Sequence, residues 1–285
     1  MKFPAFDYVS PASLDEVVAI LGERGDAAVL LAGGQSLMPI LAFRLAAPDI
    51  IVDLKNVPGL DVIDAGGDGV RLGARVRWRD IERNAALATK HPLLVEATHH
   101  IAHYQVRNRG TVGGSLALAD PAAELPGIAV TCNAEIAITG SAGERLVKAG
   151  DFFLGPMTTS LAAGEIITGL SLPAWPQGRR WAFLEFARRR GDFAMAGIAV
   201  FYDLDAAGQA AGTHIGVIGA SDRPHRLGAA EQVIDGSSVD DAAIEAAAAA
   251  AAEAVDPIED FHAPGEYRRG LVKTLVERAL QQAAS

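Results

Sequence analysis

Two glycine pairs, each followed by a hydroxyl side chain, constrain this chain more than any other feature. The first lies in Ala-Gly-Gly-Gln-Ser at residues 32–36, after a short apolar run, and the second in Thr-Val-Gly-Gly-Ser at residues 111–115. Glycines let a chain turn tightly, leave no Cβ in the way of a ligand, and allow successive N–H groups to surround an anion. The two segments therefore either hold one phosphate each of a pyrophosphate, or are unrelated turns in a chain with 30 glycines.

Better-known phosphate and nucleophile motifs do not account for these glycines. No Gly-x-Gly-x-x-Gly sits where a strand meets a helix, and no Gly-Lys-Ser/Thr occurs, so the Rossmann and P-loop motifs are excluded. Residues 113–117 begin like a hydrolase elbow, but Ala117 stands where that motif needs glycine. We therefore expect no serine nucleophile, and we assign no catalytic side chain.

Composition excludes several partners and compartments. The chain has 25 basic and 35 acidic residues, a net charge of −10, which argues against nucleic acid or an anionic membrane as the main partner. The single cysteine, Cys132, cannot form an internal disulfide, an iron–sulfur cluster or a structural zinc site. Residues 1–7 lack the apolar run of a signal peptide, and no stretch reaches the ~20 apolar residues of a membrane span, so we expect a cytoplasmic protein.

Hydrophobic patterning predicts strands and helices in both halves of the chain. A Ser-x-x-Glu capping box at Ser13 opens the first helix, and Gly22 and Gly25 are expected to close it. Further strands are predicted at residues 28–32, 50–54, 70–76 and 134–139, with helices at 79–89, 92–102 and 121–131. Prolines and a glycine at residues 172–180 suggest a domain boundary. Three strands are predicted beyond it, at 181–187, 195–204 and 214–220, followed by helices that include 246–252 and 267–282.

Several charged side chains near the second glycine pair have more than one interpretation. Asp120 and Glu124 lie one turn apart and suit acid–base work, hydrogen bonds from alcohol hydroxyls, or helix capping, which is favoured for Asp120. Arg107 and Arg109 either attract an anion or are solvated, and residues 188–190 form an arginine run. A second group, His99, His100 and His103, fits surface or packing roles better than a metal site, so we expect no metal.

Residues 32–37, 107–117 and 119–126 resemble the FAD-binding medium subunit of molybdenum hydroxylases. This family includes the medium subunit of aerobic carbon monoxide dehydrogenase and the flavin domain of xanthine dehydrogenase. The resemblance continues through residues 187–194 and ends at 266–269, covering nearly the whole chain.

The resemblance implies an α+β fold in two domains. Residues 1–176 would form a two-part FAD-binding domain of the vanillyl-alcohol-oxidase (PCMH) type, with subdomains of about 1–56 and 57–176. Residues 177–285 would form a C-terminal domain of the carbon monoxide dehydrogenase flavoprotein type, a three-stranded antiparallel sheet packed with helices.

The resemblance also implies a set of FAD-binding residues. Asp120 and Glu124 match positions near the ribityl chain, Ile101 and Ile167 match positions that line the flavin ring, and Phe193 matches an aromatic residue near the ring. The glycine segments would hold the pyrophosphate through backbone N–H groups and hydroxyls. The full set is Ala32, Gly33, Gly34, Gln35, Ser36, Leu37, Ile101, Thr111, Val112, Gly113, Gly114, Ser115, Asp120, Glu124, Ile167 and Phe193.

The function implied is electron transfer within a larger complex. A partner large subunit would hold molybdopterin, and a partner small subunit would hold two iron–sulfur clusters of the 2Fe–2S type, in a dimer of heterotrimers. FAD on this chain would pass their electrons to an external acceptor. The alternatives are a stand-alone FAD oxidoreductase of the same fold, and a flavin-free assembly or structural subunit.

Overall fold

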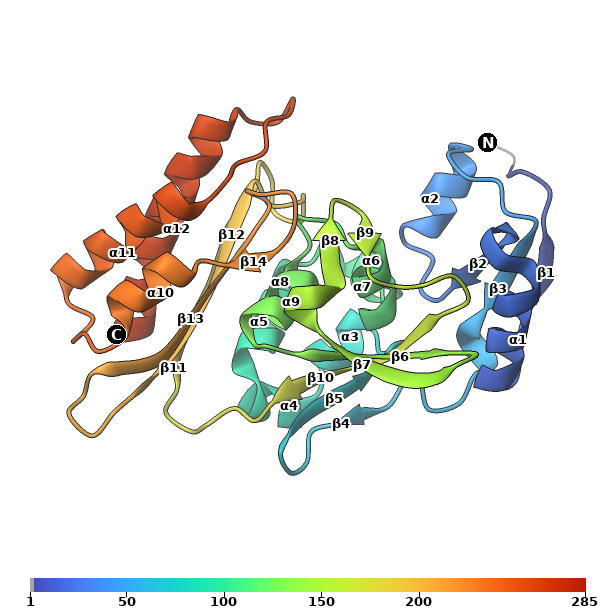
Figure 1. Ribbon diagram of the computed structural model, residues 1–285, viewed down its shortest axis with the longest axis horizontal. Helices are drawn as coiled ribbons and strands as arrows, with labels where there is room; N and C mark the ends of the chain where they lie inside the picture. Colours follow the sequence, from blue (N-terminus) through green and yellow to red (C-terminus); the bar gives the residue numbers. More distant parts are fainter. Residues whose placement is uncertain (1–2) are drawn as a thin grey trace.

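The computed structural model describes residues 3–285, so the first two residues of the N-terminal segment considered above lie outside the described part of the chain. Three units follow one another along the long axis of the molecule, each with its own sheet (Figure 1). The largest cluster of buried apolar side chains belongs mainly to the central unit and extends to Phe183, Phe201 and Ile218 of the C-terminal unit. Among residues 3–285, no helix is long and apolar enough to cross a bilayer.

The N-terminal unit is a small parallel sheet with strand order β1-β3-β2, covered by one helix. Val17 and Leu21 of that helix pack with Val52 of the central strand, because they recur on one helix face. A short helix follows the first glycine pair. The elements are β1 (Asp7–Val9), α1 (Leu14–Arg24), η1 (Gly25–Ala27), β2 (Ala28–Leu31), α2 (Leu37–Ala42), β3 (Ile50–Asp53) and η2 (Leu54–Asn56).

Helix α1 begins where the capping box predicts. Its N-cap Ser13 accepts a hydrogen bond from the Glu16 N–H at 3.2 Å. The Glu16 carboxylate reaches back to the Ala12 N–H at 2.8 Å, one residue earlier than in the usual box. Gly25 ends the helix with φ 50°, whereas Gly22, which we expected to help close it, lies within the helix.

The central unit is a five-stranded antiparallel sheet of order β4-β5-β10-β6-β7, against which a set of short helices packs. Strands β5 and β6 flank β10, so residues far apart in sequence share one core. The elements are β4 (Ile63–Asp64), β5 (Gly69–Gly73), α3 (Trp78–Glu82), α4 (Ala85–Lys90), α5 (Pro92–His100), α6 (Tyr104–Arg107), α7 (Val112–Leu118), α8 (Glu124–Thr131), β6 (Glu135–Gly140), β7 (Gly143–Lys148), α9 (Ala149–Phe152), β8 (Phe153–Gly155), β9 (Thr158–Thr159) and β10 (Ile166–Pro173).

Three predictions for the central unit are wrong in detail. The helix expected at residues 79–89 is divided into α3 and α4, because the Asn84 side chain accepts from the N–H groups of Ala86 and Leu87 and caps a new helix. The segment 111–115, expected as a loop after a strand, instead follows helix α6 and forms the first turn of α7. Helix α8 also begins at Glu124, three residues later than expected.

The C-terminal unit is an antiparallel sheet of order β11-β12-β13-β14 with three helices on one face (Figure 1). The three predicted strands are present, and a two-residue strand, β14, adds a fourth. Ala247, Ala248 and Ala251 of the alanine-rich helix are buried, so this helix packs closely on its neighbours. The elements are β11 (Arg180–Phe186), β12 (Ala196–Leu204), β13 (Ala210–Ile218), β14 (His225–Arg226), α10 (Gly228–Ile234), α11 (Asp241–Ala254) and α12 (Gly265–Ala284).

Candidate functional site

A pocket of about 400 Å³ lies where the three units meet. Its walls come from the segment after β2, from α7 and the start of α8, and from residues 191–193 of the C-terminal unit. The residues that the sequence assigns to the site all line this pocket except Val112. Val112 is fully buried in the central core, and its N–H donates to the Val76 carbonyl at 3.0 Å.

The first glycine segment presents free backbone donors to the pocket. Gly34 has φ +72°, which reverses the chain directly after β2. Within residues 3–285, the N–H groups of residues 33–36 have no hydrogen-bond partner. Gln35 stays close to its own turn, because its side-chain amide donates to the Gly33 carbonyl at 3.2 Å. A run of unpaired N–H groups in a turn is an anion-binding arrangement.

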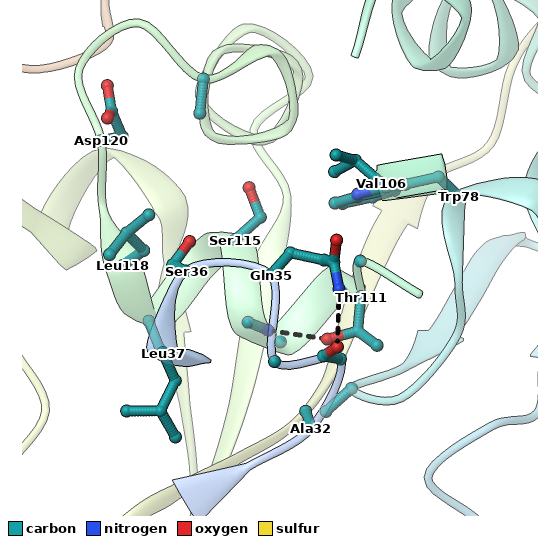
Figure 2. A pocket seen from close by; sticks show the side chains of 18 of the residues that line it. Ala32, Gln35, Ser36, Leu37, Trp78, Val106, Thr111, Ser115, Leu118 and Asp120 are labelled. Atoms are coloured by element: carbon teal, nitrogen blue, oxygen red, sulfur yellow. Dashed lines mark hydrogen bonds between the residues drawn. The ribbon is translucent and has the colours of Figure 1, made fainter. Parts of the chain in front are cut away.

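The second glycine segment differs, because the N–H groups of residues 112–115 already donate to protein atoms. Gly113 donates to the Ala74 carbonyl at 2.7 Å, and Gly114 donates to the hydroxyl of the N-cap Thr111 at 3.2 Å. This segment contributes to the pocket wall the hydroxyls of Thr111 and Ser115 and the backbone of Gly114, which has no side chain. Of the backbone donors expected at the second segment, the Thr111 N–H alone has no hydrogen-bond partner among residues 3–285. Figure 2 shows Gln35 and Ser36 beside Thr111 and Ser115.

Two carboxylic acids line the same pocket beyond Ser115. Asp120 accepts a hydrogen bond from the Ala122 N–H at 2.9 Å but does not cap helix α8, whose N-cap is Ala123. The capping interpretation of Asp120 is therefore wrong. Burial raises the pKa of Asp120. Burial, with a smaller contribution from the nearby Glu185 carboxylate, raises the pKa of Glu124 to about 8.

Apolar side chains form the remaining walls. Ile101, Ile167 and Phe193 line the pocket, and Phe193 is 63% exposed. Sequence reasoning missed Trp78 and Val106, which also line it. Trp78 begins α3 and Val106 lies in α6. No sequence pattern marks either residue, because the contribution of these short helices to a pocket depends on how they pack with distant segments. Figure 2 shows Trp78 and Asp120 at opposite edges of the group.

Arg107 supports one of these walls instead of facing an anion or solvent. Its guanidinium donates to the carbonyl oxygens of Ile101 and Ala102, each at 3.0 Å, and its Nε lies 2.8 Å from a Glu82 carboxylate oxygen. Ala102 has φ 43°, so this clamp fixes a backbone conformation that a side-chain-bearing residue rarely adopts. Neither interpretation of Arg107 from the sequence described this role.

The three histidines of the sequence analysis separate in the structure. His99 Nδ1 lies 3.2 Å from Glu82, and His100 Nδ1 lies 3.3 Å from Glu185. His103 lies against Gly191. Among the residues described, no three His, Cys, Asp or Glu side chains form a potential metal-binding group.

Comparison with known families explains this arrangement. Residues 4–175 match the model of the FAD binding domain in molybdopterin dehydrogenase, and residues 181–283 match that of the CO dehydrogenase flavoprotein C-terminal domain. The chain belongs to the FAD-binding family of molybdopterin dehydrogenases. It is thus an oxidoreductase subunit of the molybdenum hydroxylases, and FAD is its cofactor.

Relatives of this FAD-binding family match over almost their full length. The nicotine 6-hydroxylase medium subunit of Paenarthrobacter nicotinovorans is 42% identical over 285 residues, covering 100% of this chain and 99% of the relative. The structure of carbon monoxide dehydrogenase from Hydrogenophaga pseudoflava superposes with a TM-score of 0.96 at 36% identity, over 99% of this chain and 98% of that one. The structure of quinoline 2-oxidoreductase from Pseudomonas putida 86 gives 0.94 at 38% identity, over 100% and 98%.

The pocket of this family member fits FAD on its own chemistry. Unpaired N–H groups and hydroxyls suit a pyrophosphate, carboxyl groups suit sugar-alcohol hydroxyls, and the apolar walls suit an aromatic ring. The open backbone at Gly114 leaves room for close approach, since a Cβ there would meet only the Thr111 hydroxyl at 2.9 Å.

Proposed function

We propose that this chain carries FAD as the electron-transfer subunit of a heterotrimeric molybdenum hydroxylase. Electrons would arrive from iron–sulfur clusters on a small partner subunit and leave to an external acceptor. The flavin supplies the ability to exchange one or two electrons, and the protein's part is to bind and orient it. The observation that carries this proposal is the pocket at the meeting point of the three units, with free N–H groups at one segment and hydroxyls at the other.

Particular residues would hold each part of the cofactor. The N–H groups of residues 33–36 and the hydroxyls of Ser36, Thr111 and Ser115 would bind the pyrophosphate, because donors without protein partners gain most from an anion. The carboxyl groups of Asp120 and Glu124 would accept hydrogen bonds from ribityl hydroxyls.

The apolar residues would hold the flavin ring. Ile101, Ile167 and Trp78 would contact its faces and edge, and Phe193 would cover the side left open to solvent. No side chain need act as a nucleophile. The ring would therefore be held by shape and burial more than by directed hydrogen bonds.

Two partner subunits complete the proposed complex. A large subunit would hold molybdopterin, and a small one would hold two iron–sulfur clusters, in a dimer of heterotrimers. The one cysteine of this chain cannot ligate such clusters, and relatives are named medium subunits or medium chains. A protein with a single, buried cysteine fits a reducing cytoplasm.

We place the domain boundary near Pro176. Support comes from the matched ranges, which leave residues 176–180 between them, and from the connection between β10 and β11, which follows Pro173 at the end of β10 and carries Pro176. The FAD-binding domain would itself comprise residues 1–56 and 57–176, each with its own sheet.

The glycine assignment is tested by FAD titration of the purified chain, followed by absorption and flavin fluorescence. We expect Gly114→Val to lose FAD binding, because the valine side chain would occupy the open backbone of the pocket. The matched control is Gly270→Val, a helical glycine with open space around it and no contact with the pocket. Full FAD occupancy in Gly114→Val would contradict the assignment. Copurification with tagged large and small subunits tests the assembly, and a chain that oxidises a substrate without these partners would favour the stand-alone alternative.

A further inference from the structure

A chain of ionisable side chains runs from the pocket toward the surface. Glu124 of α8 lines the pocket and is 5% exposed. The next members are Glu185 on β11 and His100 at the end of α5, whose Nδ1 lies 3.3 Å from a Glu185 carboxylate oxygen. His100 Nε2 lies 3.5 Å from Glu96, whose side chain is 44% exposed. Helix α5 packs against both α8 and β11, so these elements are neighbours.

Burial makes this group unusual. The Glu185 side chain is only 7% exposed, and its second oxygen is buried with no hydrogen-bond partner in the described chain. An unpaired buried carboxylate oxygen costs free energy, so a neighbouring group that can donate a proton to it would stabilise the site. The charged groups that influence Glu124 are Glu185, His100 and Asp120. The three elements thus bring two carboxyl groups and an imidazole together where water is largely excluded.

We propose that Glu124, Glu185 and His100 form a proton path between solvent and the FAD pocket. This inference rests on the proposed function, because reduction of a flavin consumes protons as well as electrons. Glu124 releases its carboxyl proton into the pocket when two electrons arrive from the partner's clusters. His100 then passes its proton to the Glu185 carboxylate, Glu185 passes that proton to Glu124, and His100 regains a proton from solvent beside Glu96. One proton is therefore taken from solvent for each proton delivered, and every member of the path returns to its starting state.

The pKa shifts of Glu124 and His100 suit this role. Burial raises the pKa of Glu124 to about 8, so its carboxyl group carries a proton at neutral pH. The hydrogen bond with Glu185 raises the pKa of His100 above its ordinary value. A relay works best when its members gain and lose protons near the working pH, which ordinary carboxyl groups do not.

The first test uses the full chain without FAD. Infrared spectra at pH 7 are expected to show the C=O stretch of a protonated carboxyl group that disappears in Glu124→Gln and shifts in Glu185→Gln. The same band must survive in Glu245→Gln, a control on the exposed face of α11. Absence of the band from the wild-type chain overturns the proposal, since an ionised Glu124 has no proton to release.

The second test uses the FAD-loaded chain. Proton uptake after laser-flash photoreduction is followed with a pH indicator in weakly buffered solution, in samples with equal FAD occupancy. We expect uptake to slow by about tenfold or more in Glu124→Gln and Glu185→Gln and to stay unchanged in Glu245→Gln. Unchanged uptake in both path variants overturns the path while leaving FAD binding intact. Failure of the wild-type chain to bind FAD would instead overturn the proposed function, and the path with it.

Discussion

Gly33 lies so close to Arg109 that a methyl group on Gly33 would overlap the Arg109 carbonyl oxygen. The first glycine segment is therefore in direct backbone contact with the residues just before the second, and this contact joins the N-terminal unit to the central unit at the edge of the pocket. The glycine at position 33 is required for packing between units before any ligand is considered. At Gly114, the nearest atom to a built Cβ is the flexible Thr111 hydroxyl.

Gly33→Ala is expected to destabilise the chain by about 1–3 kcal/mol, because the backbone must move to relieve the overlap. Thermal unfolding monitored by circular dichroism measures this. The control is Gly22→Ala in helix α1, where a Cβ meets nothing and alanine favours the helix. An unfolding temperature equal to wild type in Gly33→Ala would contradict the close packing.

Ser115→Ala is expected to weaken FAD binding by about 10–100-fold without loss of stability. A hydrogen bond to a charged group is worth about 1.5–3 kcal/mol, and the N–H groups nearby are already engaged by protein atoms. Fluorescence titration gives the dissociation constant. Ser141→Ala, on an exposed turn outside the pocket, should leave it unchanged. Equal affinity for both variants would remove Ser115 from the pyrophosphate site.

Glu124→Gln is expected to stabilise the FAD-free chain at pH 8.5 but not at pH 4.5. The folded-state pKa of about 8 lies above the ordinary value of 4.5, so the unfolded chain ionises first and wild-type stability falls as pH rises from 4.5 through 8. Glutamine cannot ionise and removes this loss. Each pKa unit corresponds to about 1.4 kcal/mol, so the difference reaches a few kcal/mol. Urea unfolding across this pH range measures it, and parallel curves for the two proteins would contradict the shift.

His91→Asn is expected to make the free energy of unfolding depend less steeply on pH between pH 4 and pH 7. His91 caps α5 by accepting the Leu94 N–H on Nδ1 at 3.3 Å, and burial lowers its pKa to about 4 from 6.5. Its contribution is complete above pH 6.5 and is lost as pH falls toward 4, because the unfolded chain takes up the proton first. Asparagine also caps helices but does not titrate.

Urea unfolding between pH 4 and pH 7 gives the slope of the free energy of unfolding against pH for His91→Asn and for the wild-type chain. His262→Asn, on an exposed segment, is the control and should keep the wild-type slope. A wild-type slope in His91→Asn would show that His91 does not remain neutral in the folded chain.

Local signals in the sequence predicted the elements whose stability depends on nearby residues. The Ser13 cap, the buried strand 50–54 and the strands predicted at 181–187 and 195–204 formed close to their predicted bounds. The third C-terminal strand also formed, but it begins at Ala210, four residues before its predicted start. Strand β14 and helix α10 were not predicted, because two residues carry no periodicity and α10 has no side-chain N-cap.

The second glycine pair shows why the site was harder to predict. Glycine disfavours helices, so Gly113 and Gly114 suggested a loop. The structure places them in a helix, where Gly113 is required because a Cβ on it would stand 2.7 Å from the Ala74 Cβ. Long-range packing therefore overrode local preference. Glu185 was missed as a pocket neighbour for the same reason: its strand lies on a separate unit and reaches Glu124 only through the fold.

The pocket takes its walls from three units that are not equally well joined, and this has a consequence for how the molecule unfolds. The central core includes Phe183, Phe201 and Ile218 of the C-terminal unit, whereas the N-terminal core shares Ile166 with the central unit and meets it at contacts such as that between Gly33 and Arg109. A ligand that binds only the assembled walls adds its binding free energy to each opening event at once. Bound FAD would then couple the unfolding of the units, so that partial unfolding steps merge into a single cooperative transition.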